Sequence, residues 1–251
     1  MLFNSINFLI FFPIVTLLFF CLPHKHRWSL LLTASCVFYM AFIPAYILIL
    51  VLTITVDYFA GIFIEKSQGK RKKAYLIVSI ISTCSILFFF KYFNFFSSNV
   101  SAFANLMHWN YKIETLNIIL PIGLSFHTFQ SLSYVIEVYR GNQKAEYNFG
   151  IYSLYVMFYP QLVAGPIERP QNLLHQFYAE HYFDYKKATD GLRLMTWGMF
   201  KKVVIADRLS IFVNQIYDAP TFYNGPTLTL ATFFFAFQIY CDFSGYSDIA
   251  I

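Results

Sequence analysis

The sequence predicts an all-α fold, a polytopic bundle of transmembrane helices that includes re-entrant or interfacial helices. Of the 251 residues, 58% are hydrophobic and 12% are charged, whereas soluble domains carry roughly 25% charged residues. The mean hydropathy is +0.53, and apolar stretches of the length that crosses a bilayer recur along the chain. Because no internal repeat, linker or second domain is evident, we expect residues 1–251 to form part of one membrane domain.

The first 64 residues predict three spans. Residues 2–22 are apolar and are followed by the polar HKHR at 24–27. No basic residues precede this stretch and no small-residue cleavage site follows it, so we expect an uncleaved span and not a signal peptide. Residues 28–64 are too long for one crossing, and Pro44 interrupts them. They therefore predict two shorter spans that meet at a turn.

The next 75 residues predict two further crossings. Lys66 and the run KRKK at 70–73 predict a short basic loop, which is followed by a span at 74–96. Residues 97–117 are mixed in character and suit an external loop, and 118–139 form the next apolar stretch. Apolar stretches on both sides of the basic loop argue against a nucleic-acid-binding site there.

The basic residues also predict an orientation. Cytoplasmic loops of membrane proteins carry an excess of lysine and arginine. With the N-terminus outside, HKHR, the basic loop, and Arg140 with Lys144 would all lie inside. We therefore expect an external N-terminus.

The pattern changes beyond residue 148. Residues 149–167 are apolar but contain Pro160, Gly165 and Pro166, which predicts a broken, re-entrant segment. Non-helical backbone at membrane depth occurs where protein or a water-filled cavity covers it, so this segment suggests a cavity. Residues 191–213 carry five charges, and on a helical projection all but Lys202 share one face: Arg193, Lys201, Asp207 and Arg208. They predict an interfacial or protein-buried helix, with 168–208 on the cytoplasmic side and 227–251 as a last apolar segment.

A polar stripe runs along the stretch 121–141. Five residues fall within an arc of about 100° on a helix: Gly123, His127, Gln130, Ser131 and Tyr134. Such a stripe faces protein or water and not lipid. It either forms hydrogen bonds between helices or lines a substrate cavity; the third interpretation, His127 as a catalytic base, lacks a carboxylate or nucleophile at helical spacing.

The segment QLVAGPIERP, residues 161–170, also admits two interpretations. It is either a helix end or a broken segment that directs backbone amides or Arg169 at an anionic group. We include Arg140, Gln161 and Arg169 among the candidate cavity-lining residues.

Two aspartates, Asp242 and Asp248, lie in the last apolar segment. Six residues place them about 120° apart on a helix, so a general acid–base pair is not expected. Asp242 shares its face with Gln238 and Tyr246. A polar contact with another helix, a substrate contact and an ion pathway all remain open, and Gln238, Asp242 and Tyr246 complete the candidate cavity-lining set.

The four cysteines lie in apolar stretches without the spacing of a metal site. We expect small buried hydrophobic side chains at these positions and no metal ion.

Five segments together resemble the membrane-bound O-acyltransferase family, in particular the branch of bacterial alginate O-acetyltransferases. In chain order they are MLFNSINFLIFFP (1–13), LPIGLSFHTFQSLSYVIEVYRG (120–141), FYPQLVAGPIERP (158–170), GMFKKVVIADRL (198–209) and QIYCDFSGYSDIAI (238–251). The resemblance implies a helical membrane enzyme with a funnel that leads to a reaction centre within the bilayer.

The resemblance also implies the substrates and partners. Such enzymes pass an acyl group, usually acetyl in this branch, towards hydroxyls of extracytoplasmic polysaccharide. The donor would be acetyl-CoA or another activated acyl carrier on the cytoplasmic side, used as a co-substrate and not as a bound cofactor. Separate periplasmic or surface acetylation proteins would take part, and the enzyme would lie in the bacterial inner membrane.

One departure from the family pattern limits this expectation. Members of the branch run to roughly twice this length, and their catalytic histidine follows a tryptophan-rich motif downstream of DFSGYSDIAI. None of the histidines here matches it: His24, His26, His108, His127, His175 and His181. We therefore expect the N-terminal half of an acyltransferase, inactive and of poor stability by itself.

Three alternatives remain. One is D-alanyl transfer by the related D-alanine-transferring type, and another is a non-catalytic membrane relic. The third is a transporter, suggested by Asp57, Asp242 and the polar stripe. Paired inverted halves, which would favour the transporter, are not evident.

Overall fold

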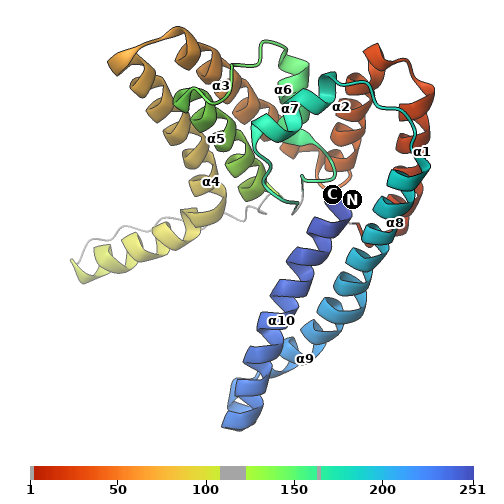
Figure 1. Cartoon of the computed structure of the whole chain (residues 1–251). Helices are drawn as coiled ribbons and strands as arrows, with labels where there is room; N and C mark the ends of the chain where they lie inside the picture. The colour runs from red at the N-terminus through yellow and green to blue at the C-terminus, as the bar shows by residue number, and fades with distance from the viewer. Residues whose placement is uncertain (1–2, 108–122, 163–164) are drawn as a thin grey trace. The chain divides into compact units, whose positions relative to one another are not determined.

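The computed structural model describes residues 3–107, 123–162 and 165–251, and every regular element in these ranges is a helix (Figure 1). The predicted all-helical class is thereby confirmed. The chain divides into two compact units. Unit 1 comprises Met1–Ala34, Phe158–Pro166 and Glu180–Ile251, and unit 2 comprises Ser35–Met157 and Ile167–Ala179.

Unit 2 is built around a long helical hairpin with a third helix packed beside it (Figure 1). Its helices are α3 (Ile47–Lys66), α4 (Gly69–Leu106), α5 (Leu124–Arg140), α6 (Phe149–Met157) and α7 (Pro170–Tyr178), preceded by the 3₁₀ turn η1 (Pro44–Tyr46). Two residues join α3 to α4, so the two helices run antiparallel. The core contains fully buried aromatic and aliphatic side chains, among them Tyr134, Tyr152 and Tyr155.

The predicted break at Pro44 is confirmed. Helix α2 (His24–Met40) ends before it, and η1 begins at Pro44. Ile43 is extended, with φ −134° and ψ 106°, because the proline ring disfavours the helical conformation of the preceding residue.

Two predicted loops are wrong in the part of the chain that the structure describes. Lys70 to Lys73 form the first turn of α4, and the loop itself is only Ser67 and Gln68. Helix α4 also continues through the predicted external loop as far as Leu106, while 108–117 lie outside the described residues. No glycine or proline occurs between Lys70 and Leu106, so nothing in the backbone chemistry ends the helix where its polarity changes.

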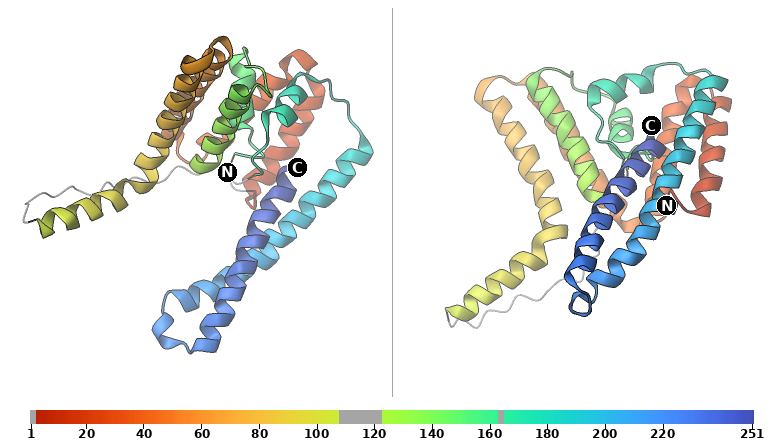
Figure 2. Two further views of the ribbon diagram at one scale, coloured as in Figure 1. Left: turned by 60° about the vertical axis from the view of Figure 1, so that its left-hand side comes forward. Right: turned by 60° about the horizontal axis from the view of Figure 1, so that its bottom comes forward.

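Unit 1 contains a second long hairpin, in which α10 runs antiparallel to a rod of three consecutive helical segments (Figure 2). The rod consists of α8 (Tyr185–Met199), the π-helix η2 (Phe200–Ala206) and α9 (Asp207–Tyr217), and the 3₁₀ turn η3 (Pro220–Phe222) leads into α10 (Gly225–Ala250). Helix α1 (Ile6–Cys21) and the start of α2 complete the unit. The predicted helix over 191–213 is present, but the π-helix interrupts its α-helical geometry. HKHR forms the first turn of α2 and not a loop.

Gly198 and Gly245 bring the two arms of this hairpin together. A Cβ atom at Gly245 would lie 2.8 Å from the carbonyl oxygen of Gly198, and one at Gly198 would lie 2.6 Å from that of Gly245. A side chain at either position would force the backbones apart. The glycines of the DFSGYSD and GMFKK segments therefore allow α10 to approach the rod closely.

Two helical segments of the described part are long and apolar enough to cross a membrane: Pro44–Lys66, with 23 residues, and Gly69–Leu106, with 38. Helix α1 is apolar but shorter, at 16 residues.

Candidate functional site

Helix α5 turns its polar stripe towards the interior of unit 2. His127, Gln130, Ser131 and Tyr134 are all buried, with at most 5% of each residue exposed. Gly123 before the helix and Gly141 after it adopt φ +76° and +82°, a conformation that glycine accepts without steric cost. The two glycines thus delimit a helix whose inward face is polar.

Ser131 belongs to a hydroxyl network around the fully buried carboxylate of Asp57. Asp57 accepts hydrogen bonds from Ser131 at 2.5 Å, from Ser79 at 2.6 Å and from Thr83 at 3.0 Å. The hydroxyl of Tyr152 lies 2.9 Å from that of Ser131, and because Ser131 donates to Asp57, Tyr152 donates to Ser131. Side chains from α3, α4 and α5 therefore meet at one carboxylate, and α6 is linked to it through Ser131. The carboxylate has no ion-pair partner among the described residues.

Tyr134 forms close contacts with two segments of unit 2. Its hydroxyl accepts a hydrogen bond from the backbone N–H of Glu146 at 2.8 Å, and its ring lies against Gly61 of α3, where a Cβ would come within 2.7 Å. These contacts give Tyr134 a structural role in the packing of α5 against α3.

Gln130 connects α5 to the FYPQLVAGPIERP segment. Its Oε1 accepts a hydrogen bond from the backbone N–H of Glu168 at 3.0 Å. Tyr155 donates to the carbonyl oxygen of Glu168 at 2.9 Å. The amide Nε2 of Gln130 and both ring nitrogens of His127 have no hydrogen-bond partner among the residues that the structure describes. The ring of Tyr39 meets the imidazole edge-on, at 6.5 Å between centroids.

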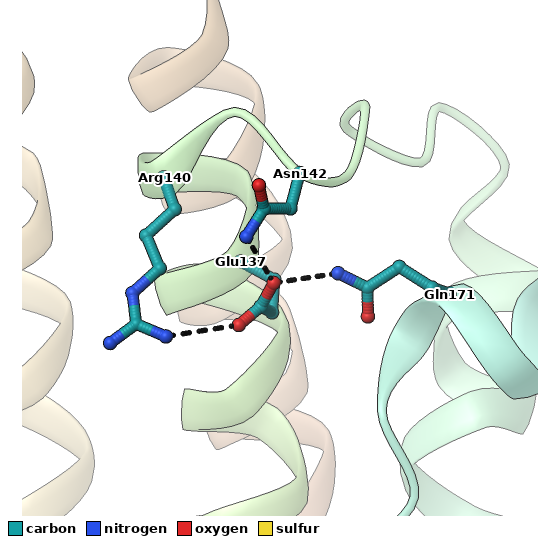
Figure 3. A network of polar contacts seen from close by, with 4 residues as sticks. All are labelled: Glu137, Arg140, Asn142 and Gln171. Carbon is teal, nitrogen blue, oxygen red and sulfur yellow. Dashed lines mark hydrogen bonds and ion pairs between the residues drawn. The ribbon is translucent and has the colours of Figure 1, made fainter.

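Glu137, near the end of α5, is the centre of a polar network that the sequence did not reveal (Figure 3). Its carboxylate accepts hydrogen bonds from Gln171 at 2.6 Å, from Asn142 at 2.9 Å and from Arg140 at 3.3 Å. The Arg140 side chain remains 64% exposed. Glu137 thus ties the end of α5 to α7 and leaves most of the Arg140 guanidinium accessible.

The two candidate residues of the QLVAGPIERP segment belong to different units. Arg169 is exposed at the N-cap of α7 and lies in unit 2. Gln161 is partly buried, with its Oε1 unpartnered, and lies in unit 1.

In unit 1 each aspartate of α10 pairs with its own lysine of the π-helix. Lys202 lies 2.5 Å from Asp242 and 3.0 Å from Asp207, and Lys201 lies 2.5 Å from Asp248. Burial lowers the pKa of Lys202, but its hydrogen bonds to the two carboxylates outweigh this effect, so the net pKa is raised. The prediction that Lys202 stands apart from the charged face is therefore wrong, because a π-helix does not follow the α-helical projection.

The remaining candidates of α10 differ in their surroundings. Tyr246 is buried. The centroid of its ring lies 5.5 Å from that of the Phe3 ring and 5.4 Å from the ammonium nitrogen of Lys202. Gln238 is partly buried with an unpartnered Oε1. Asp242 is 43% exposed, so its helix contact is made at the edge of the interface.

No group of three or more histidine, cysteine or acidic residues that could hold a metal ion occurs within the described ranges. All four cysteines are free. Cys241 is buried, but Cys21 and Cys84 are exposed, so the prediction of four buried side chains is wrong for these two. They lie on outward faces of apolar helices.

Comparison with known proteins shows close similarity to two O-acetylating enzymes, whereas no protein-family model matches the chain. The chain is 33% identical to a peptidoglycan O-acetyltransferase of Helicobacter pylori, over 88% of the chain and 46% of that protein. It is 36% identical to the probable alginate O-acetylase AlgI of Pseudomonas syringae pv. tomato, over 100% of the chain and 48% of that protein. Similarity to a teichoic acid D-alanyltransferase of Streptococcus thermophilus is weaker, 24% over 52% of the chain. The chain thus spans about half the length of the two O-acetylating relatives.

Proposed function

Because the chain belongs to the membrane-bound O-acyltransferase family, in its alginate O-acetylase branch, we propose that the protein transfers acetyl groups to hydroxyls of an extracytoplasmic polysaccharide. The observation that carries this proposal is an identity of 33–36% to four alginate O-acetylases over the whole chain. The aligned stretch includes the segments that form the polar face of α5 and the close hairpin of α10.

Alginate is the first candidate acceptor and peptidoglycan the second. The second rests on the 33% identity to the Helicobacter enzyme. Both acceptors are glycans that present sugar hydroxyls, so the chemistry at the reacting atom is the same. D-alanyl transfer is less well supported, since that relative aligns with only 52% of the chain.

The protein would lie in the bacterial inner membrane as a multi-pass helical bundle with an external N-terminus. The two membrane-length helices and the basic turn between them support this arrangement. Lys66 and Lys70 to Lys73 are concentrated at one end of the α3–α4 hairpin, as expected for a cytoplasmic end. The acyl donor, acetyl-CoA or another activated carrier, would approach from that side.

The residues of this chain would supply the scaffold and the buried polar face, and not the base. An acceptor hydroxyl must lose its proton to a group within hydrogen-bond reach. No histidine here matches the catalytic histidine that the family resemblance implies. We therefore assign the base to the tryptophan–histidine motif of the family, which these 251 residues do not contain, and delivery to the polysaccharide to separate periplasmic or surface proteins.

A bacterial host that makes alginate but lacks its own acetylase provides the test. The intact reading frame and its neighbouring acetylation genes would be expressed, and acetate released from the polysaccharide by alkali would be measured. We expect acetate with the intact gene and none with the 251-residue chain alone. Release of D-alanine in place of acetate would favour the D-alanyl alternative, and absence of any ester on alginate or peptidoglycan would refute the proposal.

A further inference from the structure

Three neighbouring side chains of α5 are almost completely buried, and each carries polar atoms that have no hydrogen-bond partner within the described ranges. The atoms are both ring nitrogens of His127, Oγ1 of Thr128 and Nε2 of Gln130, in residues that are 2%, 1% and 5% exposed. Buried polar groups are normally paired, because an unpaired one has lost its hydration without compensation. Three in four consecutive residues indicate that a polar group beyond the described residues belongs there.

The free donor of Gln130 is fixed in place. A backbone N–H can only donate, so the atom that accepts from Glu168 N–H at 3.0 Å must be the oxygen of the Gln130 amide. The Glu168 backbone is held in turn by the hydroxyl of Tyr155. The Nε2 hydrogens therefore belong to an anchored amide and have no partner in the described part of the chain.

His127 places a second donor beside the first. Either neutral tautomer of imidazole has one N–H and one acceptor nitrogen, and both nitrogens are unpartnered here. Residues three apart on a helix are neighbours on its surface. The His127 N–H and the Gln130 Nε2–H groups thus lie on one helix face, and neither has a partner among the described residues.

We propose that this donor pair, His127 and Gln130, binds the carbonyl oxygen of a short acyl ester or thioester; the proposal rests on the proposed function. A carbonyl oxygen has two lone pairs and can accept from both donors, as in sites that bind acyl groups in other enzymes. A neutral carbonyl is favoured over a carboxylate, because burial of a charge without a counter-charge is costly and neither donor has a charged partner among the described residues. The ligand is small, because both side chains lie in the interior of unit 2, and this favours the acetyl group over the polysaccharide.

Two substitutions separate binding from structure. Gln130→Glu keeps an oxygen that can accept from Glu168 N–H but replaces the free donor by an acceptor. His127→Leu removes both unpaired nitrogens. Because this substitution deletes unsatisfied buried atoms, we expect the melting temperature of His127→Leu to be equal to or above that of the unmodified chain. Gln143→Glu, in the loop after α5, is the matched control.

The binding probe is acetyl-CoA labelled with ¹³C at the carbonyl, added to the purified intact protein in lipid nanodiscs. We expect the carbonyl stretching frequency to fall on binding, and each of the two substitutions to reduce this fall and to weaken binding about five- to tenfold. Gln143→Glu should leave both unchanged. No binding, an unshifted carbonyl, or identical shifts in all variants would overturn the proposal, as would a result in which only an ordered water occupies the donors.

Acetyl transfer by the intact protein distinguishes failure of this inference from failure of the function. Wild-type rates with Gln130→Glu would overturn the donor pair and leave the acetylation function standing. Absence of transfer by the unmodified protein would overturn the function, whatever the carbonyl frequency shows.

Discussion

Replacement of Ser131 by alanine tests whether the Asp57 network holds unit 2 together. The substitution removes the hydrogen bond of 2.5 Å to the buried carboxylate and deprives the Tyr152 hydroxyl of its acceptor. A hydrogen bond to a charged group contributes about 1.5–3 kcal/mol, and an orphaned buried hydroxyl costs about 1–3 kcal/mol. Allowing for partial relaxation, we expect a loss of about 3 kcal/mol, or about 6–12 °C in melting temperature for a chain of this size.

The measurement is a thermal melt of the purified chain in detergent, followed by circular dichroism. Ser98→Ala is the matched control, because Ser98 is exposed and its hydroxyl donates to the carbonyl of Asn94 in its own helix. Its effect should stay within about 0.5 kcal/mol. If Ser131→Ala melted at the same temperature as Ser98→Ala, the network would not be a stabilising element of unit 2.

Three further predictions follow from unit 1 and from α7. Lys202→Met leaves two half-buried carboxylates without their cation and should lower the free energy of unfolding by about 1–3 kcal/mol. Arg193→Ala is the control: the Arg193 side chain is 77% exposed in its ion pair, so its loss should cost at most about 0.5 kcal/mol. Equal melting temperatures of the two variants would contradict a stabilising role of Lys202. Gly245→Ala should lower the free energy of unfolding by about 1–3 kcal/mol through overpacking. Gly191→Ala should raise it by about 0.5–1 kcal/mol, because a Cβ atom at Gly191 would meet no other atom within 4 Å. Chemical denaturation of the two variants measures both changes. Burial, and then a hydrogen bond to the Glu146 carboxylate, raise the pKa of Tyr178 in the folded chain. The contribution of Tyr178 to stability is therefore complete below its unfolded pKa of about 10 and is lost as pH rises through the folded pKa. Tyr178→Phe should reduce this loss of stability at alkaline pH, and an unchanged pH profile would refute the contact between Tyr178 and Glu146.

The features that the sequence predicted well are those with local causes. Pro44 ends helical geometry at the residue before it, whatever the rest of the chain does. The inward polar face of α5 follows from the spacing of His127, Gln130 and Ser131, because a helix of 3.6 residues per turn brings them to one side.

Loop positions were predicted less well because charge and backbone conformation are different properties. The KRKK run marks a change in polarity, but lysine and arginine are good helix formers, and the preceding glycine, with φ +59°, makes the turn. The chain therefore starts α4 at Gly69 and carries the charges on its first turn.

The polar contacts of the two units required the structure. Glu137 and Gln171 lie 34 residues apart, and no local pattern connects them. The pairing of Lys201 and Lys202 with α10 depends on a π-helix, whose hydrogen bonds the α-helical projection does not represent. Gly198 and Gly245 could be read from the sequence, but the sequence did not predict that they contact each other.

Proton NMR of the polysaccharide exported by the acetylase-deficient host tests the central claim most directly. With the intact gene and its partner genes, we expect O-acetyl methyl signals on the sugar residues, and their loss after mild alkali. A polysaccharide without acetyl esters, from cells in which the protein is present in the membrane, would contradict the account.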